Sequence, residues 1–321
     1  MRSIVPLSPE TYERHFIHGP GRAWAETNCY VDVLVELIHA LGHEPAAALA
    51  FTVSVDFEVD QWTFFKFRHE DLLEMYGMEV QELNPWLSLS QHVEEQVEGG
   101  RPVLVEMDSF YLPDTRGTAY KLAHVKSTIA VNEIDVAARH MGYFHGQGYY
   151  HVDGQDFADI FQLDGLVHER MLPPYIELVR LRPVGAGSLL ERSIASLEKQ
   201  LRLVPETNPF ETFRTRFERD FDWLMTQPIE TFHIYSFANL RQYGACYELL
   251  ETYLTWLKGQ GETGLDDVIA AFNEISSGAK AFQFKLARAM ARKKPMELEA
   301  ITAMGERWQA GVDRLKQKYL G

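Results

Sequence analysis

The sequence has little cysteine, no long apolar run and no excess of positive charge. Only two cysteines, Cys29 and Cys246, occur in 321 residues, which argues against a disulfide scaffold or a multi-cysteine zinc or iron–sulfur centre. Nowhere do about 18 apolar residues follow one another, so we expect no membrane span. The N-terminus lacks the apolar centre of a signal peptide, and we expect a cytoplasmic protein with free thiols.

Motifs that hold metals or phosphates are also missing. There is no His-Glu-x-x-His run and no cysteine pair at ligand spacing. His140, His145 and His151 are five and six positions apart, which fits no helical face, so the sequence predicts no metal site. The Gly-x-Gly runs at 146–148 and 185–187 lack the strand–turn–helix context and the lysine of a phosphate loop. We therefore expect no bound cofactor.

Acidic residues outnumber basic ones. The chain has 46 Asp+Glu and 31 Lys+Arg, a net charge of −15, which argues against nucleic-acid binding because that requires a positive field. Residues 279–321 nevertheless hold ten Lys/Arg and four Asp/Glu, a net charge of +6, which leaves −21 for the rest. This basic segment can dock an acidic partner; a solvated helical surface that ends basic is the alternative.

The hydrophobic patterns divide the chain into an α+β domain, residues 1–185, and an all-helical domain, residues 186–321. In the first, periodicity predicts helices at 27–42 and 89–98 and an aromatic hairpin between 142 and 152. Short apolar runs predict strands at 49–55, 63–67, 103–107 and 128–131. In the second, we expect helices at 188–203, 209–225, 229–258, 265–276, 279–292 and 296–319.

Cys29 is the first candidate for chemistry. It lies at the predicted start of the first helix, directly after Asn28, where the helix dipole and unpaired N–H groups favour a thiolate. A nucleophilic cysteine needs that environment. The alternative is a buried small apolar residue, an interpretation that suits Cys246 inside a long predicted helix.

His124 is the best-placed general base among the twelve histidines. It directly precedes the apolar run at 127–131, so its imidazole can project from a strand edge. A cysteine and its base are adjacent in space and not in sequence, so the distance from Cys29 along the chain is no objection. His145, in the aromatic hairpin, is a candidate supporting residue.

The order of these features resembles the butirosin biosynthesis protein H family. The features are Cys29 opening a helix, the strand at 101–108, the run Phe110-Tyr111-Leu112-Pro113, and His124 before a strand. Two further motifs, at 60–66 and 237–244, look like an uncharacterised branch of that family found beside stand-alone amino acid:carrier-protein ligases. The resemblance implies a papain-like N-terminal catalytic domain, residues 1–185, and a helical C-terminal domain, residues 186–321.

The resemblance also implies an acyltransferase. Such an enzyme takes an aminoacyl group from the phosphopantetheine thioester of a carrier protein and passes it to an amine through a Cys29 acyl-enzyme. Cys29 matches the nucleophile and His124 the base. The acidic residue that the family places about twenty positions after the histidine is missing, which leaves His145, Asp135 and Asp108 as alternatives to orient His124.

Other roles follow from the same resemblance. The glutamine that papain-like peptidases place before the cysteine is absent, so we expect Asn28 and backbone N–H groups at the helix start to bind the oxyanion. Trp62 and Tyr111 are expected to exclude water from the acyl-enzyme. One of Asp56, Asp60 and Asp108 is expected to hold the substrate's ammonium group. Ordinary buried aromatic residues and turn aspartates are the alternative.

The expected partner is an acidic carrier protein, bound through residues 279–321, and through it the amino acid:carrier-protein ligase. Two other functions stay open. The first is a papain-like peptidase or amidase, against which the missing glutamine weighs. The second is a non-catalytic module that binds the carrier or the ligase, which the missing acidic residue favours.

Overall fold

The computed structural model describes residues 2–24, 26, 28–164 and 175–321. The chain forms two compact units. Unit 1 comprises Met1–Gly19, Asn28–Pro45 and His69–Ala186, and unit 2 comprises Pro20–Thr27, Ala46–Arg68 and Gly187–Gly321. The last crossing, between 186 and 187, lies beside the predicted boundary. The two N-terminal excursions into unit 2 differ from that prediction, which assigned all of residues 1–185 to one domain.

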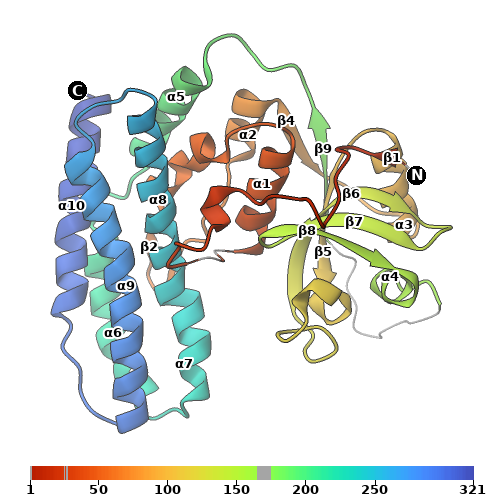
Figure 1. Cartoon of the computed structure of the whole chain (residues 1–321). Coiled ribbons are helices and arrows are strands. Elements are labelled where there is room, and N and C mark those ends of the chain that lie inside the picture. The colour runs from red at the N-terminus through yellow and green to blue at the C-terminus, as the bar shows by residue number, and fades with distance from the viewer. Residues whose placement is uncertain (1, 25, 27, 165–174) are drawn as a thin grey trace. The chain divides into compact units, whose positions relative to one another are not determined.

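Unit 1 is built around an antiparallel sheet (Figure 1). Its strands follow the order β4-β9-β5-β6-β7-β8, with the short strand β1 paired to β6. Strands β5 to β8 form a simple meander, and β9 returns from the end of the unit to lie between β4 and β5. The bounds are β1 Arg2–Ser3, β4 Met78–Glu82, β5 Val103–Asp108, β6 Lys126–Asp135, β7 His140–His145, β8 Gly148–Asp153 and β9 Ile176–Leu181.

Helices cover both faces of this sheet. Helix α1, Cys29–Ala40, packs on β6 and β7 and is buried from Val31 to Ile38. Helices α3, Leu89–Glu98, and α4, Gly154–Ile160, pack with the alternate strand residues, such as Val103 and Tyr143, in a separate apolar cluster. Because successive strand residues point to opposite faces, the sheet has an α1 face and an α3/α4 face. The remaining elements are α2 His69–Tyr76 and the short 3-10 turns η1 Phe16–His18, η3 Ser109–Tyr111 and η4 Pro113–Thr115.

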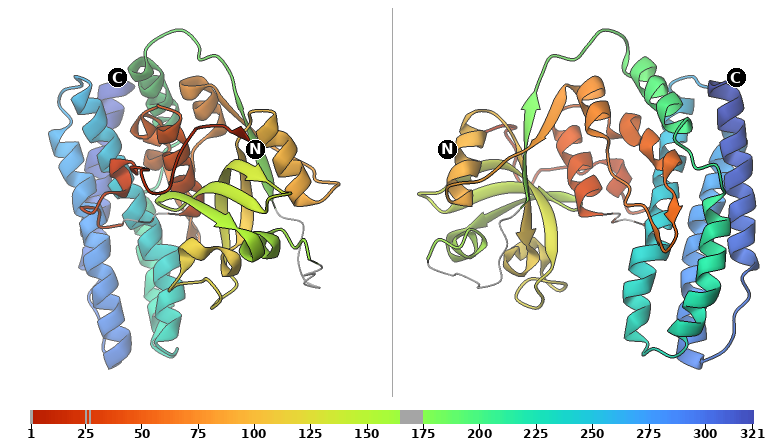
Figure 2. Two further views of the ribbon diagram at one scale, coloured as in Figure 1. Left: turned by 45° about the vertical axis from the view of Figure 1, so that its right-hand side comes forward. Right: turned by 180° about the vertical axis from the view of Figure 1, so that it is seen from behind.

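Unit 2 is mainly helical, with one short hairpin. Helices α8, α9 and α10 lie side by side, and α10 also packs on α6 (Figures 1 and 2). Its elements are η2 Pro45–Ser54, β2 Phe57–Glu58, β3 Gln61–Trp62, α5 Leu189–Leu201, α6 Pro209–Leu224, α7 Glu230–Tyr235, the π-helical turn η5 Ser236–Arg241, α8 Gln242–Gly259, α9 Asp266–Arg292 and α10 Glu299–Tyr319. No helix in the described part of the chain is long and apolar enough to cross a bilayer.

Two predicted strands and one predicted helix break are wrong. Residues 49–55 lie mostly in the 3-10 segment η2, where the chain is buried on nearly all sides; a short apolar run of this kind has no periodicity that separates helix from strand. The strand expected at 63–67 is absent: β3 stops at Trp62, and residues 63–67 have no regular secondary structure. Helix α9 runs without a break through Gly278, a residue that lowers helix propensity but does not end this helix.

A buried ionic cluster ties the N-terminal segment of unit 1 to α1. His18 Nδ1 lies 2.5 Å from Glu36 Oε1, and His18 Nε2 lies 3.3 Å from Asp32 Oδ1. Tyr12 donates a hydrogen bond to the other oxygen of Glu36. Burial by itself lowers the pKa of the His18 imidazole, but the two carboxylates raise it more, to about 9. His18 is therefore a buried cation at neutral pH, paired with two carboxylates.

We predict that this cluster makes unit 1 less stable at alkaline pH. The pKa of His18 is raised above its unfolded value of 6.5 to about 9. Its contribution is thus fully present below about pH 6.5 and lost as the pH rises through 9, on the order of 3 kcal/mol. Urea unfolding followed by circular dichroism between about pH 6 and pH 10 measures this decline.

The matched variants are His18→Gln and His39→Gln; His39 lies in the last turn of α1 and has no ion pair with Asp32 or Glu36 among the described residues. We expect His18→Gln to lower stability at neutral pH and to flatten the decline, and His39→Gln to leave the decline in place. A wild-type profile that stays flat across this range contradicts the assignment.

Candidate functional site

Cys29 is the first residue of helix α1. Asn28 caps the helix in an extended conformation, and its side chain accepts a hydrogen bond of 2.8 Å from Val31 N. This cap aligns the first turn so that the cysteine sits where unpaired N–H groups and the positive end of the dipole meet. The Cys29 side chain is partly exposed. The predicted oxyanion residue Asn28 is therefore next to the sulfur, with its side-chain oxygen engaged in the cap.

The sulfur lies against the first part of β6, an inner strand of the sheet. Cys29 Sγ is 3.5 Å from Oγ1 of Thr128 in β6. Thr128 stands opposite Glu106 of β5, so both side chains are on the α1 face. Two positions earlier on β6, Lys126 stands opposite Asp108 and donates a 2.6 Å hydrogen bond to Glu106. The α1 face beside Cys29 is thus lined by charged groups.

His124 and Asp108 form a pair on this part of the sheet. Nδ1 of His124 lies 2.6 Å from Oδ2 of Asp108, the last residue of β5. The imidazole stacks on Phe110, with ring centroids 4.3 Å apart and planes at 10°, and Tyr111 lies nearby at 6.3 Å. Of the three candidates to orient His124, the structure brings Asp108 into contact with it. Tyr111, which was predicted to exclude water from the site, therefore lies beside His124.

The other two candidates lie elsewhere. Ile129 stands opposite His145, so His145 is on the α3/α4 face, where its nitrogens bond Ser127 Oγ at 2.6 Å and Asp114 Oδ2 at 2.5 Å. Asp135 lies at the far end of β6, about 30 Å from the start of the strand at ~3.3 Å per residue. It caps a turn by accepting from Ala138 N. Neither position is consistent with a role in orienting His124.

Cys29 and His124 are on the same sheet face but not in contact. Among the described residues no hydrogen bond joins them, and the two-residue step from Thr128 to Lys126 is about 7 Å. The His124 side chain is 56% exposed. Catalytic hydrogen bonds are often long in the absence of substrate and shorten when it binds.

The expected substrate residues of the region around β2 and β3 belong to unit 2. Trp62 is 4% exposed and packs against Phe57, Phe213 and Tyr243. Trp62 is therefore a core residue of unit 2, in place of the predicted residue that lines an acyl site. Asp56 accepts a 2.7 Å hydrogen bond from Phe57 N, and Asp60 is exposed in the β2–β3 turn. Both behave as turn aspartates.

The sequence analysis missed a buried carboxylate next to Cys29. Glu177 of β9 is 2% exposed and accepts hydrogen bonds of 2.8 Å from the hydroxyls of Tyr30 and Tyr175. The Tyr30 hydroxyl is also 2.8 Å from His69 Nε2. Burial, and then the charge of Glu177, raise the pKa of Tyr30 far above its usual value, so the phenol stays protonated. A single glutamate inside the apolar strand Ile176–Leu181 was the available signal.

Two family models match the chain almost end to end. The DUF1839 N-terminal domain matches residues 13–181, and the DUF1839 C-terminal domain matches residues 186–317. The chain belongs to the DUF1839 family. No curated protein matches it. Along the sequence, the first matched segment ends with β9 and the second begins at residue 186, where the chain passes from unit 1 to unit 2.

We predict that the two cysteines of this DUF1839 protein differ strongly in reactivity. Cys29 is partly exposed at a helix start, whereas Cys246 is fully buried, and burial raises the pKa of its thiol. Iodoacetamide should therefore modify Cys29 in the native protein on the order of 100-fold faster than Cys246. Intact-mass measurement should show one adduct in the native protein and two after denaturation.

Single variants identify the modified residue. Native Cys29→Ala should gain no adduct, and native Cys246→Ala should gain one. Rapid double labelling of the native protein would contradict the burial of Cys246 and the distinct environment of Cys29.

Proposed function

We propose that the protein is a cysteine-dependent aminoacyl transferase with a papain-like unit 1. One observation carries the proposal: Cys29 opens helix α1 on the sheet face that also holds the His124–Asp108 pair. A helix-start cysteine, an imidazole and a carboxylate that orients it are the parts of a nucleophile–base–orienter set. The resemblance to the butirosin biosynthesis protein H family supports the same assignment.

The proposed chemistry has two steps. The Cys29 thiolate attacks the carbonyl of an aminoacyl carrier thioester, and N–H groups at the start of α1 stabilise the oxyanion. The C–S bond to phosphopantetheine breaks, its thiolate leaves and takes a proton from His124, and the aminoacyl group stays on Cys29. An amine then attacks this acyl-enzyme, His124 accepts the amine's proton, and the amide leaves as Cys29 becomes a thiolate again.

The charges around Cys29 favour a substrate with an ammonium group. Glu106, Asp108 and Glu177 all lie on the α1 face. Leu104 of β5 stands opposite Glu177, and Glu106 and Asp108 follow Leu104 by two and four positions on the same strand, so all of these side chains point to one face. Glu177 is held by two phenols and Glu106 by Lys126. In this proposal they replace Asp56 and Asp60 as the groups that attract the amino group of an aminoacyl donor.

Exposed basic residues on unit 2 favour the binding of an acidic partner. Arg307, Arg314 and Lys318 of α10 pair with carboxylates of unit 2. In the described structure, exposed basic residues with no such carboxylate partner gather at the end of α9 and just after it: Lys285, Arg288, Arg292 and Lys294. This group narrows the proposed carrier contact from residues 279–321 to the stretch 285–294.

The Asp108 contact bears on the choice among the three functions. A non-catalytic binding module was favoured by the missing acidic residue after His124, and Asp108 supplies a carboxylate from before it. A general-base histidine requires an orienting carboxylate, whereas a protein that only binds has no such requirement. A peptidase or amidase differs only in using water as the acceptor, so the acceptor has to be tested directly.

We predict that the protein becomes acylated by a carrier loaded with a radiolabelled amino acid. Intact mass and retained label should report one aminoacyl group per chain, lost in Cys29→Ala and kept in Cys246→Ala. His124→Gln should lower the acylation rate by about 10²–10⁴-fold. Asp108→Asn should lower it less, because it leaves the imidazole in place but unoriented.

Other outcomes assign the other functions. Free amino acid released without an amine acceptor identifies a hydrolase. Carrier binding without any label, in the wild type as in Cys29→Ala, identifies a binding module and overturns the transferase.

A further inference from the structure

Three metal-ligating side chains converge on neighbouring strands of unit 1. Glu133 comes from β6, His140 from β7 and His151 from β8, and one ligand atom of each lies within 4.8 Å of the others. The sequence analysis predicted no metal site because these histidines fit no helical spacing. Antiparallel pairing, and not a helix, brings them together.

The strand register explains the convergence. Gly142 of β7 stands between Glu133 and His151, which are its partners on the two sides. A Cβ at Gly142 would lie 2.6 Å from Glu133 Oε1 and 2.2 Å from the Tyr149 hydroxyl. The missing side chain therefore leaves a space in the row, which the Glu133 side chain and the Tyr149 hydroxyl fill. His140, two residues from Gly142 on the same face, completes the group.

The side chains are oriented as metal ligands are. Nδ1 of His140 lies 2.6 Å from Asp153 Oδ1, which leaves its Nε2 directed to Glu133 Oε1 at 3.5 Å. Metal-bound histidines usually donate their second ring N–H to a carboxylate in this way. His151 Nε2 is buried and makes no hydrogen bond, although it lies 2.9 Å from Glu133 Oε1. Glu133 Oε1 also accepts a 3.1 Å hydrogen bond from the Tyr149 hydroxyl, and a cation shared with His151 Nε2 would satisfy the close approach of the two ligand atoms.

We propose that Glu133, His140 and His151 bind a divalent transition metal of the Zn²⁺ type. Two imidazoles and one carboxylate are a known zinc ligand set, and ligand atoms around a tetrahedral zinc are about 3.3 Å apart, between the two separations above. The two imidazole ligands argue against Ca²⁺ and Mg²⁺, which prefer oxygen ligands. Asp153 then serves as the outer carboxylate that fixes His140.

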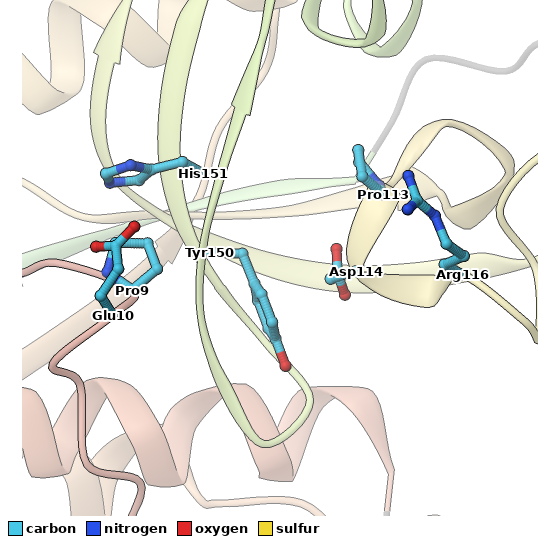
Figure 3. Close-up of a pocket in the computed structure, with 7 residues that line it drawn as sticks. All are labelled: Pro9, Glu10, Pro113, Asp114, Arg116, Tyr150 and His151. Atoms are coloured by element: carbon cyan, nitrogen blue, oxygen red, sulfur yellow. The ribbon is translucent and has the colours of Figure 1, made fainter.

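One of the three proposed ligand residues, His151, borders an open pocket. His151 lines a cavity of about 410 Å³ together with Pro9 and Glu10, and Figure 3 shows the Glu10 carboxylate beside the His151 ring. Glu10 or a water molecule can therefore complete the coordination. The site is separate from Cys29, because Thr128 and Glu133 are five residues apart on β6, about 16 Å.

The test is stoichiometric metal binding by the full chain. After treatment with a chelator, isothermal titration with Zn²⁺ should show one ion per chain, and Co²⁺ should give the visible absorption of a tetrahedral site. His140→Gln and His151→Gln should each weaken Zn²⁺ binding at least ~100-fold, and Asp153→Asn about 10-fold. Zn²⁺ should also raise the melting temperature of the wild type, because the ion links three strands.

Two controls separate this site from other zinc ligands. Cys29→Ala should bind as tightly as the wild type, which excludes a Cys29–His124 site, and so should His39→Gln. Circular dichroism and single labelling of Cys29 show whether the His140 and His151 variants are folded. Absence of stoichiometric binding, or equal binding by folded His140→Gln and His151→Gln, overturns the proposal and leaves histidine–carboxylate ion pairs.

Discussion

The antiparallel pairing of β5 with β6 is the constraint on which the candidate site depends. It places Glu106 opposite Thr128 and Asp108 opposite Lys126. The first pair carries the Thr128 hydroxyl that contacts Cys29, and the second puts the end of β5 beside the chain that leads from His124 into β6. A register shift of one residue would turn Thr128 and Asp108 to the α3/α4 face. Cys29, His124 and Asp108 would then no longer share a surface.

The same strand creates the second cluster by interrupting its own register. Between Val131 and Glu133 the pairing of β6 with β7 shifts, and Asn132 is the extra residue. The side chain of Asn132 accepts from Val5 N and donates to Val5 O, so the irregularity is held by the N-terminal segment. Beyond it, Glu133 points to the α1 face and into the space at Gly142. One long strand thus serves two chemically different places, a thiol environment at its start and a histidine–carboxylate group near its end.

Much of the local structure could be predicted from the sequence, and the site only in part. Helix α3 has the predicted bounds Leu89–Glu98 because its apolar periodicity is clear and Gly99-Gly100 ends it. Helix α1 begins at Cys29 because Asn28 is a strong cap, so the position of the thiol was predictable from two residues. The partner of His124 was not, because Asp108 lies sixteen positions before it and only the strand register brings the two together. Glu177 could not be linked to Tyr30 for the same reason.

Several histidines of unit 1 pair with carboxylates, and some of these pairs lie in its interior. His18 pairs with Asp32 and Glu36, His124 with Asp108, His140 with Asp153, and His145 with Asp114. A buried carboxylate is costly unless it is paired or hydrogen-bonded, and an imidazole can supply either a proton or a charge. The formal charge of −15 counts histidine as neutral. His18, whose pKa is raised to about 9, is charged at neutral pH, so the folded unit carries less negative charge than its composition indicates.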